Sequence, residues 1–167
     1  FLQSGHTPTL FAAFLYFDLA FMVWVILGPL GVQIAQDLQL THAQRGLMVA
    51  TPVLAGAILR LFLGLMVDHL KPKLPGAIGQ LIVMAALLYA WQVGIHSYEQ
   101  TLVFGVFLGV AGASFAVALP LASRWYPAEH QGKALGIAGA GNSGTALAAL
   151  LAPSLATAYG WGNVFGI

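Results

Sequence analysis

The stretch Thr51-Pro-Val-Leu-Ala-Gly-Ala-Ile-Leu-Arg60-Leu-Phe-Leu-Gly-Leu-Met-Val67 holds a single charged residue in an otherwise apolar run. With the apolar residues from Leu47 onward, the run is long enough to cross a membrane as a helix. A guanidinium at bilayer depth is costly and usually marks a substrate or ion pathway. Arginine also stays charged and presents its donors as a planar fork, so Arg60 predicts a small planar anion as its partner.

The composition indicates that the whole chain is embedded in lipid. Hydrophobic residues make up 59% of the 167 residues and charged residues 7%, and the mean hydropathy is +0.86. A soluble domain is about 45–50% apolar and about 25% charged. The net charge of +1 gives no basis for binding nucleic acid, and the lack of cysteine excludes disulfides and thiolate chemistry. Because the chain begins at Phe1 and ends at Ile167 inside an apolar stretch, we interpret it as a fragment of a longer protein.

Five segments are long and apolar enough to cross a bilayer, and a sixth begins near Trp161. We expect the spans at residues 11–35, 47–67, 74–95, 102–123 and 133–156. A membrane β-barrel would alternate polar and apolar residues in segments of about ten, whereas these runs are continuous. The expected fold class is therefore an all-α membrane protein with five transmembrane helices and the start of a sixth.

The basic residues predict the orientation of the spans. Lys71 and Lys73 lie in the second loop, and Arg124 and Lys133 flank the fourth, whereas the third and fifth loops carry neither Lys nor Arg. We therefore expect the even-numbered loops and the N-terminus in the cytosol. The chain would be a multi-pass protein of the inner, cytoplasmic membrane.

Small residues recur at every fourth position of the fifth expected span. The stripe consists of Gly132, Gly136, Ala140, Gly144, Ala148 and Ala152. Such a stripe lets two helix backbones approach closely. Gly139 and Asn142 lie on a face turned away from it, where a glycine lets a ligand touch the backbone. Helix packing alone remains an alternative explanation for all of these glycines.

Three residues of different chemistry are expected at one depth. Counting about 1.5 Å per residue places Arg60, Phe115 and Asn142 each within about three residues of the middle of their spans. Arginine would supply charge and forked hydrogen bonds, asparagine an amide, and phenylalanine a face that stacks on a flat ligand. The alternatives are structural: Arg60 pairs with an acid or helix-end carbonyls, Asn142 bonds another helix, and Phe115 packs in the core or faces lipid.

Asp18 lies about five residues short of the middle of the first span. It is either a proton-coupling carboxylate or a structural group, and its shallow position favours the structural role. The five histidines all lie outside the spans or at their ends, and none forms a metal-ligand pair at helical spacing. We therefore expect no metal, no cofactor, no catalytic residues and no enzyme activity.

The stretch Gly64-Leu-Met-Val-Asp68-His-Leu-Lys71-Pro-Lys73 resembles the Gly-x-x-x-Asp plus basic signature of the major facilitator superfamily. His69 stands where that signature usually has Arg, and Pro72 falls in a stretch that normally holds Gly and Arg. The resemblance implies that Gly64 and Asp68 form a cytosolic latch, in which the acid pairs with neighbouring helix ends and loop cations.

A second stretch, Ala138-Gly139-Ala140-Gly141-Asn142-Ser143-Gly144, is similar to the glycine-rich nitrate signature of the nitrate/nitrite porter family. Its context is also similar to that family, in Phe17-Asp18-Leu-Ala-Phe-Met-Val-Trp24, Gly112-Ala-Ser-Phe115, Arg124-Trp-Tyr-Pro127 and Gln131-Gly-Lys-Ala-Leu-Gly136. The resemblance implies twelve helices in two six-helix halves that rock around a central site. Residues 1–167 would supply the N-terminal half, and the C-terminal half would be its missing partner.

The resemblance also implies roles for individual residues. The residues expected to bind the anion are Arg60, Asn142, Gly139 and Phe115, and those expected to serve the signature and helix packing are Gly136, Gly141 and Gly144. The implied function is secondary active transport of nitrate, nitrite or both by alternating access, with protons as a candidate coupling ion. The alternatives are a transporter of another small anion and a membrane sensor or scaffold that does not transport.

Overall fold

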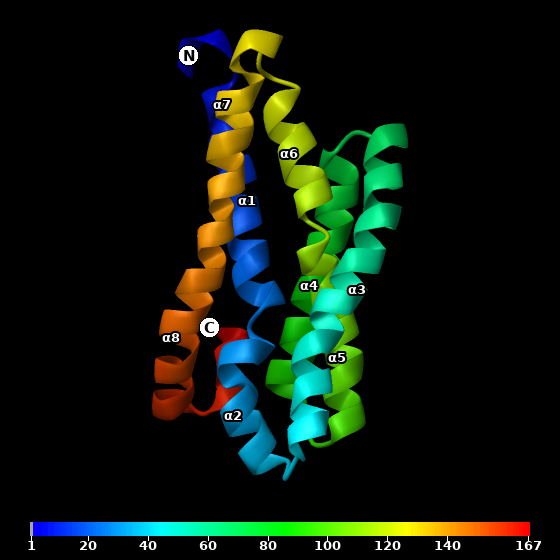
Figure 1. The fold of residues 1–167 in the computed structure, drawn as a ribbon, viewed down its shortest axis with the longest axis vertical. Coiled ribbons are helices and arrows are strands. Elements are labelled where there is room, and N and C mark those ends of the chain that lie inside the picture. Colours follow the sequence, from blue (N-terminus) through cyan, green and yellow to red (C-terminus); the bar gives the residue numbers. More distant parts are fainter. Residues whose placement is uncertain (1) are drawn as a thin grey trace.

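The computed structural model describes residues 2–167 and forms an elongated bundle of helices (Figure 1). Five segments are long and apolar enough to cross a membrane: Thr7–Asp37, His42–His69, Lys73–Gln92, Tyr98–Ser123 and Ala128–Tyr159. The five expected spans are thus confirmed, with ends that differ from the expected ones by no more than five residues. The protein is an all-α, multi-pass membrane protein.

Within the described residues every regular element is a helix. In chain order these are η1 (Leu2–Ser4), α1 (Thr7–Trp24), α2 (Leu27–Asp37), α3 (His42–His69), α4 (Lys73–Gln92), α5 (Tyr98–Gly112), α6 (Phe115–Ser123), α7 (Ala128–Gly139), η2 (Ala140–Ser143), α8 (Gly144–Tyr159) and η3 (Trp161–Gly166). The elements labelled η are 3-10 helices. Three spans are therefore interrupted: α1 is followed by α2, α5 by α6, and α7 by η2 and α8.

Each interruption has a local cause. Pro29 lacks an N–H group and its ring displaces the carbonyl of Val25, four residues earlier, which is where α1 gives way to α2. Between α5 and α6 the Ser114 N–H turns back to the Ala111 carbonyl at 3.0 Å, a tighter bond than the α-helical one. In the fifth span the glycines on both sides of η2 weaken the helix. The interruptions place irregular backbone inside the spans.

The helices of the bundle pack closely in two places. The α3–α5 interface is the most extensive one in the described chain. A Cβ added at Gly109 of α5 would lie 2.5 Å from Ala55 Cβ and 2.8 Å from the Gly56 nitrogen, so this glycine allows the close approach. On the other side α1 packs against α7, η2 and α8. Figure 1 shows α1 between the α7–α8 column and the column that holds α5 and α6.

The small-residue stripe of the fifth span differs from its expected course. From Gly144 onward it is buried as expected, through Ala148 and Ala152. In α7 the buried residues are instead Ala134 and Ala138. The stripe members before Gly144 are exposed, namely Gly132 and Gly136 in α7 and Ala140 at the start of η2. A 3-10 helix turns by about 120° per residue and an α-helix by about 100°. The passage through η2 therefore rotates the buried face, which a constant spacing of four could not predict.

The outer surface of α3 is strongly apolar. Its exposed side chains include Leu54, Ile58, Leu61, Phe62 and Leu65, and Leu61 is 70% exposed. Contiguous apolar surface of this kind is covered by a membrane or by another protein surface. The surface is consistent with the spans that the hydropathy predicts.

Candidate functional site

Arg60 lies on α3 beside the interruption between α5 and α6. Its Nη2 donates a hydrogen bond to the Gly112 carbonyl oxygen at 3.0 Å. The interruption makes this carbonyl available, because the Ser114 N–H donates to Ala111 and the Ala116 N–H to Ala113, both at 3.0 Å. Of the two structural partners considered for Arg60, the helix-end carbonyl is therefore present.

The charge of Arg60 is not neutralised by any acid among residues 2–167. No carboxylate of these residues lies within salt-bridge distance of the guanidinium. The Arg60 Nε atom is buried and has no hydrogen-bond acceptor among residues 2–167. Arg60 is half-buried; a carbonyl satisfies one of its donors but carries no charge, whereas a charge removed from water is normally paired with an opposite charge. The arrangement leaves a cation and spare donors in the middle of the bundle.

Phe115 is the first residue of α6 and covers the guanidinium. The Arg60 Cζ lies 5.2 Å from the centroid of the Phe115 ring, within the range of a cation–π contact. The Phe115 ring centroid also lies 5.6 Å from the ring centroid of Phe17 on α1. The structure thus brings together Arg60 and Phe115, which the sequence places at one depth, and makes the aromatic ring a wall beside the cation.

Asn142 and Gly139 lie across α1 from Arg60. Asn142 belongs to η2 and is exposed, and a Cβ added at Gly139 would meet nothing within 4 Å. Neighbouring Gly141 packs against Phe17, whose Cβ lies 3.0 Å from the position a Gly141 Cβ would take. The residues in contact therefore run from Arg60 through two phenylalanine rings to η2. The hydrogen bonds of Arg60 and Asn142 found among residues 2–167 go to other partners, Gly112 for Arg60 and Thr145 for Asn142.

Asp18 faces η2. Its side chain is buried, with 7% exposed, and its Oδ1 accepts a hydrogen bond from Ser143 Oγ at 2.6 Å. This contact joins residues 125 positions apart in the sequence. Hydropathy and spacing gave no signal for it, because serine is common in apolar helices and Ser143 drew notice only as part of a glycine-rich motif.

Trp24 is a further residue that spacing did not single out. Its Nε1 donates to the Pro52 carbonyl at 2.8 Å, and its ring lies where side chains would project from Gly56 and Gly112. Trp24 therefore ties the end of α1 to α3 and α5, directly beside the carbonyl that Arg60 binds. In the sequence it was noted only as the last residue of the stretch from Phe17 to Trp24 that is similar to the porter family.

We expect Gly112→Ala to disturb both Trp24 and the carbonyl bound by Arg60. A Cβ at this position would overlap the indole ring, and the hydrogen bond to Pro52 keeps the ring from moving aside. Overpacking of this kind costs about 1–3 kcal/mol. The melting temperature of the complete protein in detergent should fall, whereas Gly46→Ala, which meets nothing within 4 Å, should not lower it. Equal melting of both variants would contradict the packing.

The expected latch at Gly64 and Asp68 does not form an ion pair in the described chain. Asp68 is exposed, and no basic side chain of residues 2–167 lies within salt-bridge distance of it. Instead Arg124 Nη2 donates to the Val67 carbonyl at 3.4 Å. Val67 points into the bundle, and the next residue is rotated by about 100° around the helix, which turns Asp68 outward.

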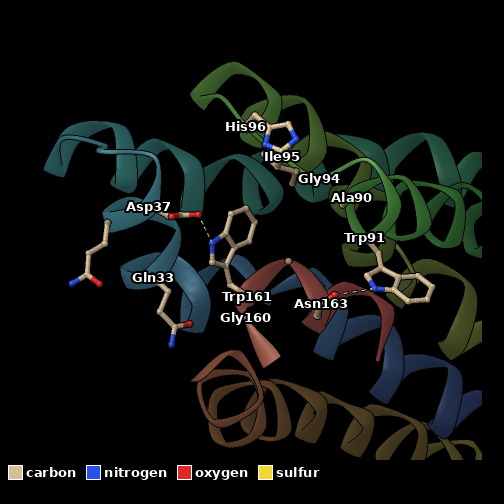
Figure 2. A pocket seen from close by; sticks show the side chains of 12 residues that line it. Gln33, Asp37, Ala90, Trp91, Gly94, Ile95, His96, Gly160, Trp161 and Asn163 are labelled. Atoms are coloured by element: carbon tan, nitrogen blue, oxygen red, sulfur yellow. Dashed lines mark hydrogen bonds between the residues drawn. The ribbon is translucent and has the colours of Figure 1, made fainter. Parts of the chain in front are cut away.

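A hollow of about 700 Å³ lies at the end of the bundle where α2 and α4 finish and η3 begins (Figure 2). Two hydrogen bonds join residues that line it: Trp161 Nε1 donates to Asp37 Oδ2 at 3.0 Å, and Trp91 Nε1 donates to Asn163 Oδ1 at 3.2 Å. Its walls include a carboxylate and no Lys or Arg. It does not suit an anion, so the candidate site remains at Arg60.

Known proteins match the chain over almost its whole length. The sequence profile described as Major Facilitator Superfamily matches residues 10–167. The chain belongs to this superfamily. Membership in the major facilitator superfamily agrees with the all-α membrane fold and with the signature noted after the second span.

Relatives with similar sequences are named for nitrate and nitrite. A probable nitrate/nitrite transporter of Mycobacterium tuberculosis is 37% identical over 144 residues, which are 84% of this chain and 36% of that protein. The nitrite extrusion protein of Bacillus subtilis is 34% identical over 141 residues (84% and 35%). A probable nitrate/nitrite antiporter of Thermus thermophilus is 33% identical over 154 residues (92% and 34%). The resemblance to nitrate/nitrite porters is thereby confirmed, and the chain spans about a third of the length of these relatives.

Proposed function

We propose that the complete protein transports nitrate, nitrite or both across the cytoplasmic membrane by alternating access, and that Arg60 binds the anion. The observation that carries the proposal is the Arg60 guanidinium, which holds one backbone carbonyl and no carboxylate of residues 2–167. A cation left without an acid inside a membrane bundle favours an anionic substrate. The names of the relatives support nitrate or nitrite as that anion.

The proposed binding mode uses the plane of the anion. Nitrate is flat, so its oxygens match the forked donors of Arg60, and Phe115 provides a ring beside it. Asn142 and the open backbone at Gly139 lie on the other side of α1. They reach the anion at Arg60 when the rings of Phe17 and Phe115, which lie between, move apart. The guanidinium keeps the Gly112 carbonyl on Nη2 and presents its other donors, the unpartnered Nε among them, to the anion.

The proposed site needs a second half of the transporter to close it. We propose that residues 1–167 are the N-terminal six-helix half, with the N-terminus in the cytosol, and that a C-terminal half closes the central site. Gly136, which is exposed here, is then available to pack against that second half. Gly64 and Asp68 form their latch with cations that the described residues do not place beside them.

Flux through the complete protein in liposomes tests the function. Asp18 is engaged by Ser143, which favours anion exchange over proton coupling. We therefore expect nitrate uptake to require nitrite or nitrate inside the vesicle and to be the same at two pH gradients. Uptake driven by a proton gradient without a counter-anion would establish symport. Nitrate binding without any flux would indicate a sensor that does not transport.

A further inference from the structure

We propose that Asp18 and Ser143 form a tether that positions Asn142 for the anion. The proposal rests on the proposed function, since it concerns the same site. Neither residue touches the anion in this scheme, so both are positioning residues. Asn142 immediately precedes Ser143 in η2, and the tether fixes that segment to α1.

The first support is the close approach of η2 to α1. A Cβ at Gly141 would lie 2.8 Å from the Phe14 carbonyl oxygen and 2.9 Å from the Asp18 nitrogen, and a Cβ at Gly144 would overlap the Asp18 carbonyl. These two glycines flank Asn142 and Ser143. Backbone therefore rests on backbone on both sides of the hydrogen bond, which holds Ser143 Oγ at 2.6 Å from Asp18 Oδ1.

The second support is the burial of the carboxyl group. Asp18 is the ionisable residue among the buried polar side chains of the described chain, and a buried carboxyl group without a hydrogen-bond partner is costly. No basic side chain of residues 2–167 lies within salt-bridge distance of it. The Ser143 hydroxyl is the side-chain donor that the structure provides, so each residue needs the other.

The third support is the weakness of η2 on its own. The segment is a four-residue 3-10 helix, and no side-chain hydrogen bond caps its start at Gly139. Short 3-10 segments have poor hydrogen-bond geometry, and glycine favours the unfolded backbone. Asn142 itself is exposed, and its backbone carbonyl accepts a hydrogen bond from Thr145 Oγ1 at 2.8 Å, a contact within the same segment that does not connect it to α1. The tether supplies the missing constraint.

Nitrate transport by the complete protein in liposomes tests the tether, with KM and Vmax measured separately. We expect Ser143→Ala to raise KM by about three- to tenfold, the effect of one hydrogen bond, while Vmax changes little. Ser143→Thr keeps the hydroxyl and Asp18→Asn keeps an acceptor oxygen, so both should stay near the parent KM. In an Asn142→Ala background Ser143→Ala should add nothing further.

Two results would overturn the proposal. If Ser143→Ala raises KM equally with and without Asn142, the tether does not act through that amide. If Asp18→Asn stops transport while Ser143→Ala is silent, the carboxyl group acts in its own right, for instance with a proton.

Amide hydrogen exchange of residues 140–145 tests the tether independently of nitrate transport. It therefore distinguishes failure of the tether from failure of the proposed function. The tether predicts faster exchange in Ser143→Ala whether or not nitrate is a substrate. Absence of nitrate flux in the unmodified protein would refute the proposed function, and unchanged exchange in Ser143→Ala would refute the tether.

Discussion

Replacing Arg60 by lysine is expected to abolish most of the nitrate-dependent stabilisation of the complete protein, although the positive charge is kept. Arginine can hold the Gly112 carbonyl with one nitrogen and still present other donors to an anion in the same plane. Lysine is a compact point charge without this fork. Losing one charged hydrogen bond costs about 1.5–3 kcal/mol, which is roughly 10- to 100-fold in affinity.

The measurement is the melting temperature in detergent as nitrate is titrated, with sulfate as the control anion. Arg60→Ala should lose the response completely, because both the charge and the fork are gone. Arg45→Lys, the same change on the same helix, should keep it. An Arg60→Lys protein that responds to nitrate like the parent would show that charge alone suffices and that the forked geometry is not used.

The number and type of the spans could be predicted because a bilayer imposes length and hydropathy on each of them. The interruptions within the spans could not be predicted by the same means. Hydropathy is blind to the position of a missing N–H, so Pro29 passes unnoticed inside an apolar run. The rotation of the buried face at η2 depends on a local change of helix type, which left Gly132 and Gly136 exposed instead of buried.

Depth counting placed Arg60 and Phe115 together correctly because the rise per residue is nearly constant in neighbouring helices. Depth counting gives only the position of a residue along the membrane normal. It could not tell that α1, with Phe17, stands between Arg60 and Asn142. Contacts that depend on side-chain direction, such as Ser143 with Asp18 and Trp24 with Pro52, likewise left no periodic trace. Depth counting therefore predicts which residues lie at one level, but not how they are arranged around it.

Gly144→Ala should be among the most damaging conservative changes in the chain. The added methyl group would overlap the backbone carbonyl of Asp18, and a backbone atom cannot rotate away as a side chain can. Overpacking costs about 1–3 kcal/mol when side chains give way, so we expect about 3 kcal/mol or more here. The α1–α8 contact would open, and the melting temperature of the complete protein in detergent should fall by several degrees.

Gly132→Ala is the matched control, because it makes the same change in the same span where a Cβ meets nothing within 4 Å. Alanine favours a helix over glycine by about 0.5–1 kcal/mol, so this variant should melt at or slightly above the parent temperature. The opposite signs separate the loss of close packing from any general effect of removing a glycine. If both variants melted at the parent temperature, α1 and α8 would not be in backbone contact at Gly144, and η2 would lose one of the two glycine contacts that place Ser143 against Asp18.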